Sequence, residues 1–200
     1  MDNHAVSTKR ANITIVSLVF MMNATYIYLL RLYVFLYLVR GIATKVEYTN
    51  INCTSLDKEF CDFEYCYLKS VNRTYKYMSL KVNLYKIPIR QVKVNFSLLK
   101  RFNGYKPFLY NITVDACKIL KYPKSNPVFG WFHSLFSEHS NMNHTCPFDH
   151  DLVVEKLSAD YINKQFTEVL PYPHGEYLFH SNWFANNVKR ASVNVYATLS

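Results

Sequence analysis

The sequence predicts an all-β domain, an antiparallel two-sheet sandwich or β-cup of about eight strands with one short helix. Three observations predict it. Apolar and polar residues alternate from Lys76 to Val114, turn residues separate these runs, and one segment after Pro127 has helical spacing instead. Alternation with period two is typical of strands that have one buried and one solvated face. Short strands separated by turns are typical of sandwiches and barrels.

The alternating region contains three runs, each with an apolar and a polar face. The apolar positions are Leu80, Val82 and Leu84, then Val92, Val94, Phe96 and Leu98, and then Phe108, Tyr110, Ile112 and Val114. The polar positions include Ser79, Lys81 and Asn83, then Lys93, Asn95 and Ser97, and then Asn111, Thr113 and Asp115. Pro88 and the Asn103-Gly104 pair separate the runs, which suits turns between antiparallel neighbours. A meander is the simplest topology.

Five further segments are predicted strands, which brings the total to about eight. They are Val46 to Cys53, Cys66 to Val71, Leu152 to Leu157, Tyr177 to Trp183 and Ala191 to Leu199.

Residues 127–137 break the alternation and predict a short amphipathic helix. Its apolar residues are Val128, Trp131, Phe132, Leu135 and Phe136. Gly130 weakens the helix by about 1 kcal/mol of propensity. Closing one end of the sandwich is the ordinary role for such a face, and acting as a lid over a ligand entrance or touching a membrane surface are the alternatives.

The first 43 residues predict a signal peptide. Arg31, the apolar stretch Leu32 to Val39 and the small residues Gly41 and Ala43 follow the order of a secretory signal, with cleavage after Ala43. The alternative is an uncleaved signal anchor, since Ile13 to Leu30 nearly reaches the length of about 20 residues that a span needs. Either arrangement places residues 44–200 outside the cytosol as a single domain.

The charge of the chain favours anionic partners in general. The full sequence has 23 basic and 14 acidic residues, a net charge of +9. Residues 1–43 contain four of the basic residues and one acid, so residues 44–200 keep 19 basic and 13 acidic residues, or +6. Solubility is the ordinary consequence of such a charge. Nucleic acid is excluded as a partner, because the basic residues form no run and the compartment is wrong.

Five cysteines in an extracellular domain predict disulfides. The favoured pairs are Cys53 with Cys66 and Cys117 with Cys146, because each closes a modest loop worth about 3 kcal/mol. Cys61 is left over, and it is an alternative partner for either member of the first pair. A continued strand would point Cys117 toward solvent, so we expect a bulge or the end of the strand there.

Asn-x-Ser/Thr sequons predict N-glycosylation of the mature domain. The acceptor residues are Asn52, Asn72, Asn95, Asn111 and Asn143. Asn95 and Asn111 fall on the polar faces of their predicted strands, where a glycan has room.

Five blocks of sequence resemble a large family of secreted fly proteins that is catalogued as a domain of unknown function. The blocks are Thr49-Asn50-Ile51-Asn52-Cys53, Cys66-x-Leu68-Lys69-x-x-x-Arg73, Tyr105-Lys106-Pro107-Phe108-Leu109-Tyr110-Asn111-Ile112-Thr113-x-Asp115-x-Cys117, Asn141-x-Asn143-His144-Thr145-Cys146-Pro147-Phe148-x-His150-Asp151 and Leu170-Pro171-x-Pro173-x-Gly175-x-Tyr177. The resemblance spans about residues 46 to 185. This chain departs from the family pattern at Cys61 and in its long, interrupted leader.

The resemblance implies a fold similar to the lipid-recognition (ML) superfamily and to the β-cup of the ganglioside activator. Some relatives, the chemosensory B proteins, are associated with detection of contact pheromones. The family carries no established enzymatic site to transfer.

The sequence therefore predicts a secreted, non-enzymatic protein that holds a lipid or other hydrophobic small molecule between two sheets. The abundance of aromatic residues, with 17 Tyr, 14 Phe and 2 Trp, suits an apolar interior. The predicted lining is the inward register, namely Leu80, Val82, Leu84, Val94, Phe96, Leu98, Tyr110, Ile112, Tyr177 and Phe179. The alternative is a protein-interaction module with a fully packed core that contacts a receptor or other extracellular protein. Membrane contact is expected only through an uncleaved N-terminal segment.

Catalytic, metal and cofactor chemistry has little support in the sequence. One cluster of potential ligands occurs, formed by His133, His139, His144, Cys146, Asp149, His150 and Asp151. Its spacing matches no standard zinc motif, so a hydrogen-bonded structural loop is the preferred interpretation. Neither a Gly-x-Ser-x-Gly elbow nor a Gly-rich phosphate loop is present. We expect no enzymatic activity, no bound metal and no cofactor.

Overall fold

The structure is a computed structural model that describes residues 26–35, 45–73, 75–166 and 172–200. It divides into two compact units, Met1–Ala43 and Thr44–Ser200. Residues 26–35 of the first unit form an α-helix whose side chains are exposed. None of the helices among the described residues is both long and apolar enough to cross a membrane. The predicted cleavage after Ala43 and most of the predicted signal or anchor lie outside the described residues, and both stay predictions.

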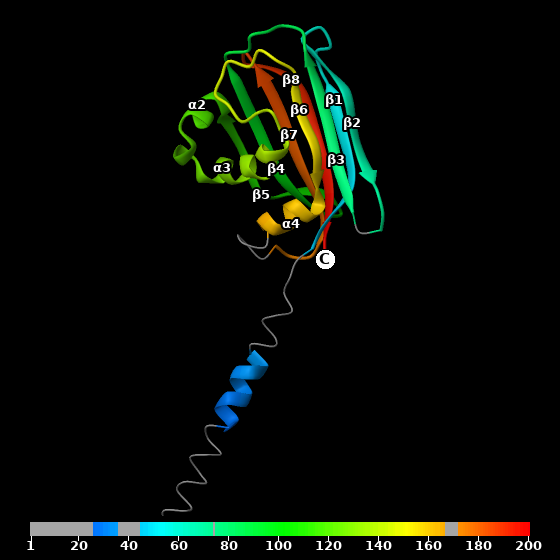
Figure 1. The fold of residues 1–200 in the computed structure, drawn as a ribbon, viewed down its shortest axis with the longest axis vertical. Coiled ribbons are helices and arrows are strands. Elements are labelled where there is room, and N and C mark those ends of the chain that lie inside the picture. The colour runs from blue at the N-terminus through cyan, green and yellow to red at the C-terminus, as the bar shows by residue number, and fades with distance from the viewer. Residues whose placement is uncertain (1–25, 36–44, 74, 167–171) are drawn as a thin grey trace, which may run out of the picture. The chain divides into compact units, whose positions relative to one another are not determined.

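The second unit is a sandwich of two antiparallel sheets (Figure 1). In its described residues the larger sheet has five strands in the order β1-β8-β7-β4-β5, and the smaller has three in the order β2-β3-β6. The strands are β1 (Val46–Ser55), β2 (Cys61–Ser70), β3 (Lys76–Leu84), β4 (Val92–Phe102), β5 (Gly104–Asp115), β6 (Leu152–Ser158), β7 (Gly175–Ala185) and β8 (Val188–Leu199). This confirms the predicted two-sheet antiparallel class with eight strands.

The predicted meander is wrong at one step. β4 and β5 are hairpin neighbours as expected, with Gly104 at the turn in the left-handed region at φ +90°. β3 and β4, in contrast, belong to different sheets. The segment between β3 and β4 pairs with the loop before β6, since Ile89 and Phe148 exchange backbone hydrogen bonds of 2.7 and 2.9 Å. The crossing allows the apolar face of each strand to cover that of the other sheet, whereas a single-sheet meander would leave both in water.

The predicted solvation of the polar face fails at Ser79, because its side chain is fully buried. The β3–β6 register shifts between Met78 and Leu80, so Ser79 lies opposite a bulge in β6. Lys156 occupies that bulge with φ +48°, and its backbone N–H donates to Ser79 Oγ at 2.9 Å. The Ser79 hydroxyl therefore accepts a hydrogen bond from a backbone N–H that, because of the bulge, does not take part in the regular strand pairing.

Helices surround the sandwich at one side and one end (Figure 1). The predicted helix corresponds to α3 (Pro127–Ser134), but the second unit also has α2 (Ala116–Lys121), α4 (Ala159–Phe166) and the 3-10 turns η1 (Pro123–Ser125) and η2 (Ser137–His139). The side chain of Asp115 caps α2 by accepting from Lys118 N, and that of Asn126 caps α3 by accepting from Phe129 N. β5 thus ends at Asp115, two residues before Cys117, as expected.

Asn163 of α4 binds the beginning of β1. Its Nδ2 donates to the carbonyl oxygen of Val46 at 3.1 Å, and the Val46 N–H donates back to Asn163 Oδ1. The amide side chain therefore supplies the hydrogen bonds that a neighbouring strand would supply. This covers part of an exposed sheet edge, which is where unpaired backbone groups invite aggregation.

Two disulfides have the pairings that the sequence favours. Cys53–Cys66 joins β1 to β2, which are edge strands of different sheets, with their Cα atoms 6.2 Å apart. Cys117–Cys146 joins α2 to the loop before β6, with Cα atoms 5.3 Å apart. Cys61 is buried and free, and burial raises the pKa of its thiol. The thiol is therefore held in its protonated, less reactive form.

Replacing both Cys53 and Cys66 with alanine should lower the free energy of unfolding by about 3 kcal/mol. The reason is that the unfolded chain regains the entropy that a cross-link over 13 residues removes. Urea denaturation followed by tryptophan fluorescence measures the change. Both proteins should carry Cys61→Ala so that no free thiol exchanges with the bridges, and equal denaturation midpoints would contradict the prediction.

Candidate functional site

A cavity of about 250 Å³ lies in the interior of the sandwich. Inner-face residues of both sheets line it, together with residues of α2, α3 and α4. Eight of the ten predicted lining residues belong to its wall: Leu80, Val82, Leu84, Val94, Phe96, Leu98, Tyr177 and Phe179. These eight residues come from β3, β4 and β7.

Tyr110 and Ile112 are not part of the lining. Both alternate inward on β5 as expected, but β5 is the edge strand next to α2 and α3. The ring of Tyr110 meets the edge of Phe132 in α3 with the centroids 5.8 Å apart, and Ile112 packs against the same apolar cluster. Both side chains therefore pack beside the helices and outside the cavity lining.

The lining also includes residues of β1 and β8, which were not among the predicted lining residues. Tyr48 of β1 and Val193, Val195 and Ala197 of β8 all contribute. The alternation of β8 was visible in the sequence, since Ser192, Asn194 and Tyr196 separate its apolar residues. Phe60, Ile89 and Phe148 lie outside the main strands, and no sequence pattern identified them.

The lining runs along most of the length of the sheets. Tyr48 pairs with Ala197 near one end of β8, and Arg190 lies at a bulge near the other end. Strands rise by about 3.3 Å per residue, so these two lining residues are on the order of 20 Å apart. The cavity is therefore elongated in the strand direction.

An aromatic cluster forms one wall. Phe132 of α3 packs on Phe96 of β4 at a centroid distance of 4.3 Å and on Phe179 of β7 at 5.2 Å. The buried residues of the helix are Phe129 and Phe132, so its inner face is rotated from the predicted one. Val128 and Trp131, which were predicted to face inward, are partly buried beside the cluster and outside the lining. Their neighbours Leu135 and Phe136, just beyond the end of the helix, do line the cavity.

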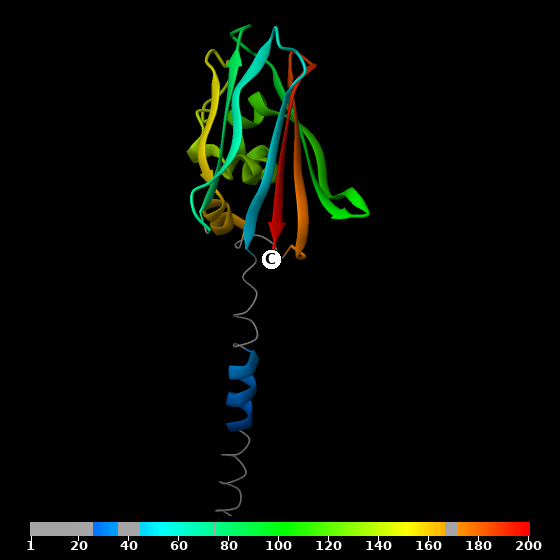
Figure 2. The ribbon, with the colours of Figure 1, turned by 90° about the vertical axis from the view of Figure 1, so that its right-hand side faces the viewer.

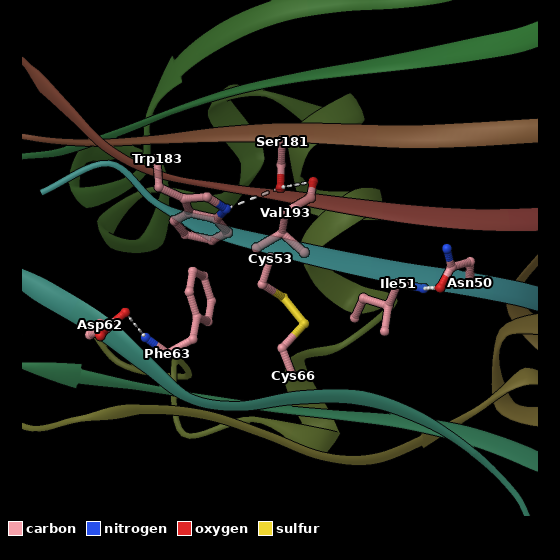
Figure 3. The surroundings of a disulfide bond; sticks show 9 residues. All are labelled: Asn50, Ile51, Cys53, Asp62, Phe63, Cys66, Ser181, Trp183 and Val193. Carbon is pink, nitrogen blue, oxygen red and sulfur yellow. Dashed lines mark hydrogen bonds between the residues drawn. A yellow bond between two sulfur atoms is a disulfide. The ribbon is translucent and has the colours of Figure 1, made fainter. Parts of the chain in front are cut away.

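The Cys53–Cys66 disulfide bounds the opposite edge of the cavity. Figure 3 shows the bridge between the two sheets, with Phe63 and Trp183 on one side and Val193 beside it. These three side chains are part of the lining. Ser181 accepts a hydrogen bond from Trp183 Nε1 at 3.0 Å, so the partly buried indole has a partner. The wall beside the disulfide is thus mainly apolar.

One permanent charge belongs to the lining, the guanidinium of Arg190. Its Nη1 forms an ion pair with Asp57, and its Cζ lies 4.2 Å from the centroid of the Phe60 ring. This pairing offsets the cost of placing a cation beside an apolar space. The cavity therefore carries little net charge.

The histidine-rich cluster is dispersed in the structure. His133 Nε2 is 3.2 Å from the carbonyl oxygen of Met142, and His139 Nδ1 is 3.1 Å from that of Glu155. His144 and His150 share a hydrogen bond between their Nε2 atoms at 2.8 Å. No group of three or more metal-ligating side chains converges within the described ranges.

The sequon residues differ in exposure. Asn52, Asn72, Asn111 and Asn143 are exposed, whereas Asn95 is half-buried on β4. The Asn95 Nδ2 donates to Asn111 Oδ1 and to Thr113 Oγ1, both at 3.0 Å. Asn95 and Asn111 therefore share the outer face of the five-stranded sheet, and their amides contact each other there.

The described fold and site define a two-sheet β-sandwich with an apolar internal cavity. A family model described as "Protein of unknown function (DUF1091)" matches residues 94–179, which run from β4 into β7. Among solved structures, the chain is similar to a Niemann-Pick type C2 protein from Japanese carpenter ant, at 12% sequence identity and a TM-score of 0.29. The alignment covers 77% of this chain and 92% of that one. No curated protein matches the chain.

Phe132→Ala should lower the free energy of unfolding by about 3–5 kcal/mol, because Phe132 joins α3 to both β4 and β7 and its removal extends the cavity. Thermal and urea denaturation measure the loss. Phe102→Ala is the matched control, since Phe102 is 61% exposed and its truncation should change stability by no more than about 0.5 kcal/mol. Similar losses in the two variants would show that Phe132 does not support the sandwich.

Proposed function

We propose that residues 44–200 form a secreted, non-enzymatic binding domain that holds a hydrophobic small molecule or lipid between its two sheets. The observation that carries the proposal is the apolar cavity of about 250 Å³, with eight predicted inward positions in its wall. Removing apolar ligand surface from water drives binding, at about 25 cal/mol per Å². The resemblance of the sequence to lipid-recognition proteins points to the same function.

The cavity volume sets the size of the guest. An engineered cavity of about 150 Å³ binds benzene, so about 250 Å³ accommodates about ten non-hydrogen atoms. A longer lipid requires side chains such as those of α3 to move, or it extends beyond the sandwich. The natural ligand in this proposal is therefore small, or elongated and only partly enclosed.

Secretion and glycosylation belong to the same proposal. The two disulfides suit an oxidising compartment. The sequons at Asn52, Asn72, Asn111 and Asn143 are exposed and thus open to glycans. The resemblance to chemosensory B proteins makes a contact pheromone a candidate ligand, and an uncleaved N-terminal segment would tether the same domain to a membrane.

The cavity also bears on the two alternatives. An interaction module with a fully packed core would leave no such space, so binding inside the sandwich is the better-supported function. An enzyme would need a nucleophile held by a base, or a metal. Ser181 and His133, two polar residues of the lining, instead form hydrogen bonds to backbone carbonyl groups.

The affinity for straight-chain 1-alkanols should rise about fourfold for each added methylene, because each buried CH₂ contributes about 0.8 kcal/mol. The rise should level off near ten non-hydrogen atoms, where the cavity is full. Isothermal titration calorimetry of the purified domain with alcohols from hexanol to dodecanol measures the series. Absence of binding across the whole series would refute the proposed function.

Val195→Phe should weaken the binding of these alcohols about tenfold, because the larger ring occupies space that two ligand methylenes would fill. Leu178→Phe is the matched control. Leu178 lies on the neighbouring strand β7 in the register that points away from the cavity, so its substitution should leave affinity unchanged. Equal effects of the two substitutions would locate the ligand elsewhere.

A further inference from the structure

The loop between η2 and β6, residues 140–151, holds two histidines whose rings share a hydrogen bond. His144 Nε2 and His150 Nε2 are 2.8 Å apart, and the ring centroids are 4.9 Å apart. Both side chains are half-buried, and neither belongs to the lining of the cavity. The proposed function therefore leaves this pair without a role, although imidazole is the side chain whose charge ordinarily changes between pH 5 and 8.

The contacts of the two rings limit the number of protons that the pair can carry. A hydrogen bond between two nitrogens needs one N–H group and one lone pair, so one of the two Nε2 atoms is unprotonated. His144 Nδ1 lies 2.8 Å from the carbonyl oxygen of Thr145, which fixes a proton on that nitrogen. His150 Nδ1 lies 3.2 Å from Asn141 Nδ2 and 2.8 Å from the carbonyl oxygen of Asp151, so it has a partner with or without a proton. The pair thus accommodates one extra proton, whereas a second brings two N–H groups and two positive charges face to face.

The surroundings supply no close counterion for a second proton. Within the described residues, no carboxylate oxygen lies within 4.0 Å of a ring nitrogen of either histidine. Of the two acids in the loop, Asp149 is exposed, and Asp151 already accepts from Leu84 N at 3.0 Å and lies 3.8 Å from Lys81 Nζ. The charged and titratable side chains of the neighbouring elements are mainly basic: Lys81 of β3, Lys86 and Arg90 of the segment between β3 and β4, Asp115 at the cap of α2, Lys118 and Lys121 of α2, His133 of α3, Glu138 and His139 of η2, and Glu155 and Lys156 of β6.

The histidine pair closes a loop that forms part of the cavity wall. Phe148 packs on both rings, with centroid distances of 4.9 Å to His144 and 6.4 Å to His150. Phe148 is 4% exposed and lines the cavity, and its backbone pairs with that of Ile89. Met142, near the beginning of the loop, lines the cavity as well. Separation of the two rings therefore acts on side chains that a guest would contact.

We propose that the His144–His150 pair is a pH-sensitive latch that holds residues 140–151 against the cavity at neutral pH. At acidic pH the second proton breaks the hydrogen bond between the rings, the loop loosens, and the guest is bound more weakly. The unfolded chain takes up both protons freely, so the folded protein binds one proton fewer at acidic pH, and the stability that the pair contributes falls as the pH falls. The effect on binding rests on the proposed function, whereas the effect on stability does not.

His144→Gln tests the latch, because the glutamine amide can bond to His150 at any pH and does not titrate. Urea denaturation at pH 7 and pH 5 measures the unfolding constant. Between these values the constant of the unmodified protein should rise about tenfold more than that of the variant, since the variant lacks the proton difference between folded and unfolded chains. His150→Gln should give the same result and replaces the first variant if that one does not fold.

His174→Gln is the matched control, because it also removes one histidine, but an exposed one in the segment before β7. It should keep the pH dependence of the unmodified protein. Equal pH dependence of stability in the unmodified protein and in the variants of the pair would overturn the proposal.

The second measurement is the affinity for 1-nonanol, which is uncharged at both pH values. In titration calorimetry the unmodified protein should bind it about tenfold more weakly at pH 5 than at pH 7, because the apparent affinity falls with the fraction of molecules whose loop is closed. His144→Gln should bind it equally at both. Equal affinity of the unmodified protein at the two pH values would overturn the link between the latch and the cavity. Absence of binding at both would refute the proposed function, and the stability measurement would still decide whether the pair is a latch.

Discussion

The spacing between the two sheets is set at two places, and the cavity depends on both. At one edge, the Cys53–Cys66 disulfide holds the Cα atoms of β1 and β2 at 6.2 Å, well within the roughly 10 Å that separates stacked sheets. At the other edge the outer strands are β5 and β6, and the chain between them contributes α2 and α3. Figure 2, turned by 90°, shows the sandwich from the side of β1 and β2. Phe132 of α3 packs against the inner face of the larger sheet, so aromatic side chains occupy part of the space that a second sheet would otherwise fill.

The chemistry of the interior follows from this arrangement. Two apolar faces that do not meet along their whole width leave a space whose wall is made of hydrocarbon and aromatic side chains. Few voids larger than a water molecule survive in ordinary cores, because packing there is as dense as in organic crystals. A cavity of about 250 Å³ therefore costs stability, and the two disulfides help the domain to tolerate that cost.

Local patterns predicted the strands well, and they failed where a distant segment intervened. The inward register of Val94, Phe96 and Leu98 follows from alternation and was correct. Ser79 follows the same rule on β3, yet a bulge in β6 buries it. Tyr110 alternates inward as expected, but it packs on the ring of Phe132 and is not part of the cavity lining. Periodicity assigns a side chain to a face, and it contains no information about what covers that face.

The amino-acid order was sufficient for the all-β class, the β4–β5 hairpin at Gly104 and the favoured cysteine pairs, because each depends on spacing along the chain. The separation of β3 and β4 into different sheets and the contribution of β1 and β8 to the cavity depend on the fold. These features arise from contacts between segments far apart in sequence. A local sequence pattern does not identify which distant residues make these contacts. The composition indicated an apolar interior. The size and polarity of the cavity depend on how the two sheets pack, which is a matter of contacts between distant segments.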